Sequence, residues 1–191
     1  MNSALNVLPS KKHWGIALSI AFFMLLTRGS HVLSSVSLPD ASLALFLFGG
    51  LYLRKSLWFA AFFVLAAIID FGAAALDPLQ GFCLTNGYWG LIPAYGVMWL
   101  GGHWLATQRD DYSTLAYAAV SITSTTLAFI ISTQTYYLFS GRFPASGVVE
   151  SMQHGWEYLP SYLGFTMMYF AIVWLVVRVL RRLNVTRSAT A

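Results

Sequence analysis

The sequence predicts an all-helical integral membrane protein with six membrane-spanning helices. Of its 191 residues, 58% are hydrophobic and only 9% are charged, whereas soluble domains carry about a quarter charged residues. The mean hydropathy of +0.65 points the same way. Mostly apolar stretches of about 20 residues, enough to cross the hydrocarbon core, recur between polar, Gly and Pro residues. We therefore interpret residues 1–191 as one transmembrane domain, with no room for a soluble one.

The first three predicted spans lie in the N-terminal half of the chain. The first covers about residues 14–26, and its helix is free to continue past Arg28 toward Leu38. The second covers about residues 40–53 and is short for a membrane-spanning helix. The third covers about residues 57–76 and has the full length that a span needs.

The last three predicted spans follow a connection rich in Gly and polar residues at 77–90. They cover about residues 88–106, 112–139 and 159–180. The span at 112–139 carries many Ser and Thr side chains, whose ordinary role within a membrane is hydrogen bonding between helices. Irregular backbone such as that of residues 77–90 is tolerated at membrane depth only where protein buries it or where it lines a cavity.

The distribution of Lys and Arg predicts that both termini are cytoplasmic. Only Arg28 and Arg142 fall on one side of the predicted spans. The other nine basic residues fall on the opposite side: Lys11, Lys12, Arg54, Lys55, Arg109, Arg178, Arg181, Arg182 and Arg187. Because cytoplasmic connections carry the excess of basic residues, we expect a multi-pass protein of the cytoplasmic (inner) membrane. The net charge of +4 is then explained by the basic residues of the cytoplasmic connections, and we expect no nucleic-acid partner.

Motifs for the common enzyme centres are absent from the sequence. It contains no G-x-S-x-G, H-E-x-x-H, Walker A or G-x-G-x-x-G motif, so we expect no ATP site and no hydrolase centre in this chain. A single cysteine excludes an intramolecular disulfide, a Cys-x-x-Cys redox pair and a cysteine-rich metal cage.

Chemically versatile side chains gather instead on the predicted outer face, opposite the basic connections. Asp70 lies in the outer part of the third span, where an ionisable residue is either functional or a helix-end carboxylate that reaches water. Cys83 lies in the connection 77–90 and is either a small apolar filler or a thiolate that serves a metal or a reactive ligand. His31 is either an interfacial histidine or a ligand.

The first span also carries Ala17 and Ala21, a small-xxx-small pair that allows another helix to approach closely. The partner helix is either in another chain or within the same bundle.

With these residues in place, the sequence resembles the S-components of energy-coupling factor (ECF) vitamin transporters, specifically the solitary cobalamin-binding BtuM-type members. The resemblance rests on the six-span layout, the Ala17-x-x-x-Ala21 pair, and the outer set of His31, Asp70, Cys83 and Tyr88. Cys83 lies within the segment Gly-Phe-Cys-Leu-Thr-Asn-Gly-Tyr, which ends at Tyr88.

The resemblance implies a membrane subunit that captures vitamin B12 at the face toward the periplasm or exterior. It implies that the Cys83 thiolate is an axial ligand of the corrin cobalt, and cobinamide would be accepted as well as cobalamin. Asp70 and Tyr88 would hydrogen-bond amides on the rim of the ring, and His31 would serve as a second axial donor or orient the thiol. The thiolate would also expel cyanide from cyanocobalamin. The Ala17 and Ala21 face would dock the ECF coupling subunit, whose ATPases power uptake.

Three alternatives stay open on the sequence. One is a small membrane enzyme that uses Cys83 and His31 as a thiol and general-base pair. Another is an S-component for a different vitamin, with Cys83 structural. The last is a membrane assembly partner that uses the Ala17 face and binds no ligand.

Overall fold

The computed structural model describes residues 11–28, 38–108, 113–143 and 147–189, and all their regular structure is helical. This confirms the all-helical fold class, with a helix at each of the six predicted spans. The six main helices are α1 (Lys11–Arg28), α3 (Ser42–Tyr52), α4 (Ser56–Leu76), α5 (Leu91–Thr107), α6 (Thr114–Phe139) and α8 (Leu159–Ala189). Short helical turns occupy two of the connections: η1 (Pro78–Cys83), η2 (Asn86–Gly90), α7 (Val148–Ser151) and η3 (Trp156–Tyr158).

Contacts between sequence-distant residues define one end of the bundle, which we call the Arg28 end. Arg28, the last residue of α1, hydrogen-bonds Asp70 near the end of α4 at 2.6 Å. Arg142, just after α6, donates to the carbonyl oxygen of Phe82 in η1 at 3.0 Å. Helices α1, α4 and α6 therefore end on the side where α3, α5 and α8 begin.

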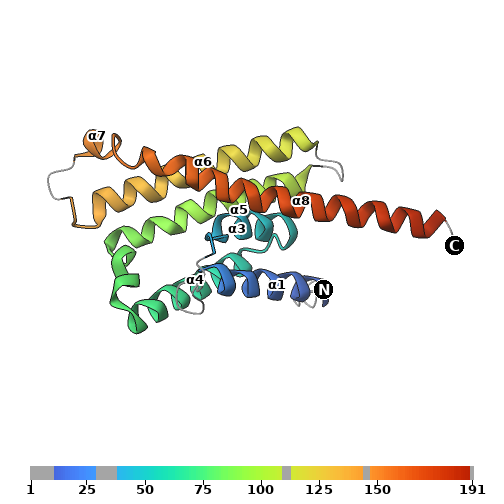
Figure 1. The fold of residues 1–191 in the computed structure, drawn as a ribbon, viewed down its shortest axis with the longest axis horizontal. Helices are drawn as coiled ribbons and strands as arrows, with labels where there is room; N and C mark the ends of the chain where they lie inside the picture. Colours follow the sequence, from blue (N-terminus) through green and yellow to red (C-terminus); the bar gives the residue numbers. More distant parts are fainter. Residues whose placement is uncertain (1–10, 29–37, 109–112, 144–146, 190–191) are drawn as a thin grey trace, which may run out of the picture.

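The opposite end, which we call the Arg54 end, is fixed by two further contacts. The Arg54 guanidinium, in the turn between α3 and α4, donates to the carbonyl oxygen of Ala106 at 2.6 Å. Arg178 of α8 donates to the hydroxyl of Thr114, the first residue of α6, at 3.0 Å. Helix α1 begins and α8 ends on this same side of the molecule (Figure 1).

Three helical segments are long and apolar enough to cross a membrane: Ser56–Leu76, Thr114–Phe139 and Val148–Val179. Much of their apolar surface faces outward, with Ile68, Leu115 and Leu175 all more than half exposed. Soluble monomers rarely expose large contiguous apolar patches, whereas a lipid-facing surface requires them. The prediction of a membrane protein is therefore supported by the fold.

Helix α3 differs from the span predicted over residues 40–53. Its 11 residues rise about 16 Å at about 1.5 Å per residue, half the hydrocarbon thickness of about 30 Å. Every residue from Ser42 to Leu51 is buried, against α1, α4, α5 and α8. A helix that is apolar all round and enclosed by protein is a core helix. This segment is apolar because protein surrounds it and not because it faces lipid.

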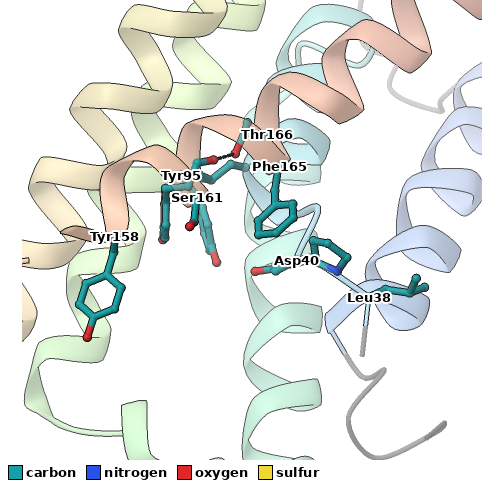
Figure 2. Close-up of a pocket in the computed structure, with 10 residues that line it drawn as sticks. Leu38, Asp40, Tyr95, Tyr158, Ser161, Phe165 and Thr166 are labelled. Carbon is teal, nitrogen blue, oxygen red and sulfur yellow. Dashed lines mark hydrogen bonds between the residues drawn. The ribbon is translucent and has the colours of Figure 1, made fainter. Parts of the chain in front are cut away.

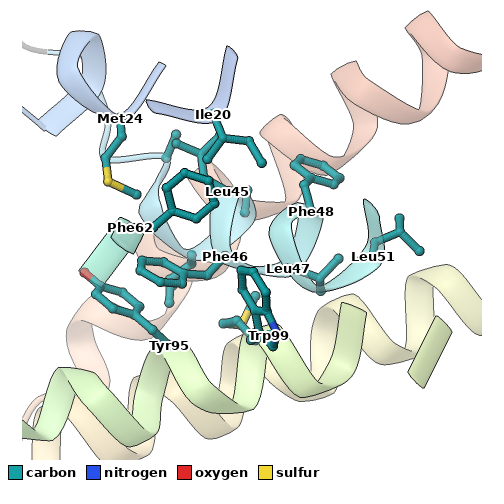
Figure 3. Packing of buried hydrophobic residues seen from close by; sticks show 14 of the residues in the cluster. Ile20, Met24, Leu45, Phe46, Leu47, Phe48, Leu51, Phe62, Tyr95 and Trp99 are labelled. Atoms are coloured by element: carbon teal, nitrogen blue, oxygen red, sulfur yellow. The ribbon is translucent and has the colours of Figure 1, made fainter. Parts of the chain in front are cut away.

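The core is built around α3 and its closest neighbour α5. Phe46 of α3 stacks on Tyr95 of α5 with ring centroids 4.2 Å apart, and Figure 3 shows Trp99 beneath the same helix. Gly50 and Gly102 let the two backbones touch: a Cβ at Gly50 would overlap the carbonyl oxygen of Trp99, and one at Gly102 that of Leu47. Close packing of α3 on α5 therefore requires glycine at both positions.

The small-residue pair of α1 faces into this core. Ala17 is only 3% exposed and belongs to the same buried cluster as Ile20 and Met24, while Ala21 is partly buried against it. Leu18 and Phe22, on the other side of α1, are more than half exposed. In this chain the close approach allowed by Ala17 is used within the bundle, so the Ala17 side chain is not free to receive a helix of another protein.

Candidate functional site

A polar cluster within the bundle is centred on Arg28. Its guanidinium forms two parallel hydrogen bonds with the carboxylate of Asp70, both 2.6 Å long. The Arg28 side chain is 10% exposed and that of Asp70 is 19% exposed. A bidentate pair of this kind is stronger and more directional than an ordinary ion pair. It ties the end of α1 to α4.

The remaining donors of Arg28 reach α3 and α5. Its Nη1 atom lies 2.9 Å from the Ser42 hydroxyl, 2.6 Å from the Tyr95 hydroxyl and 3.2 Å from the carboxylate of Asp40. Asp40 also accepts hydrogen bonds from the backbone N–H and the hydroxyl of Ser42, at 2.9 and 2.6 Å. One guanidinium therefore connects α1, α3, α4 and α5 at the Arg28 end.

Tyr88 completes this cluster from the connection between α4 and α5. Its hydroxyl donates to Asp70 at 2.9 Å, and its ring packs against those of Phe63 and Phe71 of α4. Burial, and next the neighbouring Asp70 carboxylate, raise the pKa of the Tyr88 hydroxyl well above its usual value. The hydroxyl therefore stays protonated and remains a donor to Asp70. We call Arg28, Asp40, Ser42, Asp70, Tyr88 and Tyr95 the Arg28 cluster.

The connection that carries Cys83 folds back at this end of the bundle. Asp77 opens it by accepting the backbone N–H of Leu79 at 3.0 Å, and η1 then packs against α4. Arg142 holds the turn from the other side, since its guanidinium lies 3.8 Å from the centre of the Phe82 ring. The backbone of Cys83 ends η1, while its side chain lies outside the part of the chain that the structure describes.

The structure thus joins two of the four predicted site residues. Asp70 and Tyr88 are in direct contact, although both are engaged with protein partners instead of standing free for a ligand. His31 lies outside the described residues. In the described ranges, no group of three or more His, Cys, Asp or Glu side chains is placed to hold a metal ion. A metal carried within a bound ligand needs only an axial donor from the protein, and a thiolate is chemically suited to cobalt.

Sequence reasoning missed Arg28 as a site residue and counted it only toward topology. The available signal was a lone arginine at the end of an apolar span, with aspartates at 40 and 70 at the corresponding ends of two other spans. A charged side chain at such a depth needs a partner, and these carboxylates are its partners here.

A pocket of about 500 Å³ borders the Arg28 cluster. It lies between the start of α3, the start of α8 and Tyr95 of α5, and it is lined by four aromatic rings, those of Tyr95, Tyr158, Tyr162 and Phe165. Asp40 is its one charged lining residue. Figure 2 shows Ser161, Phe165 and Thr166 on α8, with Asp40 and Leu38 on the segment that precedes α3. The volume falls within the range of small-molecule sites.

No model of a known protein family matches this chain, and no curated protein matches it either.

Proposed function

We propose that this protein is the substrate-capture subunit of a vitamin transporter, a BtuM-type S-component that binds a corrinoid at the Arg28 end. The observation that carries the proposal is the 2.9 Å hydrogen bond between Tyr88 and Asp70. It joins two predicted site residues, and Tyr88 belongs to the same connection between α4 and α5 as Cys83. A pocket and a polar cluster at that end, with apolar helices around them, suit a membrane protein that takes its ligand from one side.

The Arg28 end faces the periplasm or exterior in this proposal. Lys11 and Lys12 begin α1, and Arg54 and Lys55 lie in the turn at the opposite end, in keeping with the positive-inside rule. Reporter fusions after Asp77 or Phe143 are expected to be periplasmic, and fusions at Arg54 cytoplasmic. A cytoplasmic reporter at Asp77 would invert the site and contradict the proposal.

Within the site, Cys83 is the proposed axial ligand of cobalt. A thiolate is soft and anionic, so it forms a strong coordinate bond with a corrin cobalt. His31 is proposed to orient the thiol or to serve as a second donor. Asp70 and Tyr88 are both held in the Arg28 cluster by hydrogen bonds to protein partners. We propose that they fix the connection that presents Cys83, and do not read the rim of the ligand.

Uptake in this proposal also requires a partner, since the sequence holds no ATP-binding motif. The partner would be an ECF coupling subunit with its ATPases. Because Ala17 is buried in the core, docking would use an outward surface of the chain and not the Ala17 side chain.

Binding of corrinoids to the purified protein tests the function. The protein in detergent or nanodiscs is expected to bind cyanocobalamin and cobinamide at one molecule per chain and to become coloured. Cobinamide lacks the nucleotide tail, so a more than hundredfold weaker affinity, about 2.8 kcal/mol at 1.4 kcal/mol per tenfold, would refute recognition through the ring. No binding of either corrinoid would refute the function itself.

A further inference from the structure

The pocket beside the Arg28 cluster has an unbalanced charge on its wall. The cluster contains one guanidinium and two carboxylates, which gives it a formal net charge of −1. Asp70 takes the bidentate contact at 2.6 Å, whereas Asp40 has a single longer contact of 3.2 Å with Arg28. The Asp40 side chain is also 49% exposed. The residual negative charge is therefore carried by the carboxylate that lines the pocket.

Two other parts of the pocket wall are held in place by contacts within the protein. Tyr95 is fixed by its stacking on Phe46 and by the hydrogen bond from Arg28. The segment before α3 is attached to α8, because the hydroxyl of Tyr169 donates to the carbonyl oxygen of Pro39 at 2.7 Å. A wall that is ordered before binding costs little entropy when a ligand arrives.

The lining therefore combines aromatic faces, hydroxyls and one partly exposed carboxylate. Tyr158, Tyr162 and Phe165 present apolar surface, and Ser161 lies among them. A carboxylate accepts hydrogen bonds but donates none when ionised. A ligand edge that matches this lining has apolar surface between groups that donate hydrogen bonds, and it carries no negative charge.

We propose that this pocket receives the amide-bearing rim of the corrinoid, with Asp40 accepting hydrogen bonds from rim amide N–H groups. This inference rests on the proposed function and names the part of the substrate that the pocket recognises. At about 500 Å³ the pocket takes one edge of a corrin ring and not the whole molecule. The charge of Asp40 weakens the binding of corrinoids in which a contacting amide has become a carboxylate.

Corrinoids with one rim propionamide hydrolysed to a carboxylate test this directly, each positional isomer being measured separately. The unaltered protein is expected to bind at least one isomer on the order of tenfold more weakly than the parent corrinoid, because like charges then face each other. In Asp40→Asn this penalty is expected to shrink below about threefold, since the amide keeps an oxygen for Ser42 but loses the charge. Glu150→Gln, which removes an exposed carboxylate of α7 outside the pocket, is expected to keep the full penalty.

Ser161→Trp provides a second variant that leaves the Arg28 cluster intact. The indole fills the pocket, so binding of the parent corrinoid is expected to fall on the order of tenfold or more. Three results would each overturn the inference while leaving the proposed function standing. They are equal binding of all isomers, a penalty that persists in Asp40→Asn, and unchanged binding by Ser161→Trp. Failure of the unaltered protein to bind any corrinoid would overturn both.

Discussion

The guanidinium of Arg28 at the end of α1 forms a bidentate pair with the carboxylate of Asp70 in α4, with both hydrogen bonds at 2.6 Å. The two residues are 42 positions apart in the sequence. Their pairing, together with the contacts of Arg28 to Ser42 and Tyr95, connects four helices at the end proposed to bind the ligand.

Removing either member of this pair is expected to destabilise the protein strongly. Arg28→Leu removes the guanidinium from Asp70 and leaves it only the Tyr88 hydroxyl, while Asp70→Leu leaves Arg28 with Asp40 as its remaining carboxylate. Each is expected to cost about 1–3 kcal/mol. The double variant is expected to cost less than the two single variants together, because neither Arg28 nor Asp70 is then left without the other. Thermal unfolding of the four proteins in one detergent measures this coupling, and additive losses would show that the pair contributes nothing.

The close packing of α3 on α5 predicts opposite effects for two glycines of the same helix. Gly102→Ala is expected to destabilise the protein by about 1–3 kcal/mol, because its Cβ would overlap the Leu47 carbonyl oxygen. Gly96→Ala is the matched control, since nothing lies within 4 Å of its Cβ position. It is expected to be neutral or to stabilise by up to about 1 kcal/mol through helix propensity. Equal unfolding temperatures for the two variants would contradict this packing.

The burial of Ala17 predicts that a bulky residue there prevents folding and does not merely block a partner. Ala17→Trp is expected to reduce the yield of monodisperse protein, while Leu18→Trp, at a position that is 63% exposed, is expected to be tolerated. Size-exclusion profiles of the two variants make the comparison. A well-folded Ala17→Trp protein that binds ligand but fails in uptake would instead assign Ala17 to a partner interface.

The raised pKa of Tyr88 predicts a loss of stability at high pH. Above about pH 10 the unfolded chain releases the tyrosine proton, whereas folded Tyr88 retains it. The unfolded state then binds fewer protons than the folded state, so stability falls as pH rises. Below about pH 10 Tyr88 adds no pH dependence. Tyr88→Phe is expected to show a shallower decline between about pH 10 and 12, and identical slopes would show that Tyr88 titrates normally.

The sequence was sufficient to predict the helices because apolar runs and their breaks are local features. It was also sufficient to mark Asp70, since an ionisable residue near the end of a span needs an explanation. It did not predict the partner of Asp70, because that contact depends on how α1 packs against α4. The same holds for Tyr95, whose hydroxyl meets Arg28 only after α3 and α5 have packed.

Two sequence patterns were ambiguous for a physical reason. An apolar segment such as residues 42–52 has the same sequence pattern whether lipid or protein surrounds it. Only the packing in the structure shows that protein encloses α3. A small-residue pair such as Ala17 and Ala21 permits close approach without specifying which helix approaches.

The central claim concerns cobalt ligation by Cys83, and visible absorption spectra of bound cyanocobalamin test it most directly. A thiolate on one axial face weakens the bond on the opposite face, so the benzimidazole is expected to dissociate and leave the vitamin base-off. Where the thiolate takes the cyanide position, the Co–S bond forms, the Co–C bond breaks and cyanide leaves with its electron pair, without change in the oxidation state of cobalt. Cys83→Ala is expected to abolish both the spectral change and cyanide release, and Cys83→Ser is not expected to restore them. A Cys83→Ala protein with unchanged affinity and an unchanged bound spectrum would contradict the assignment.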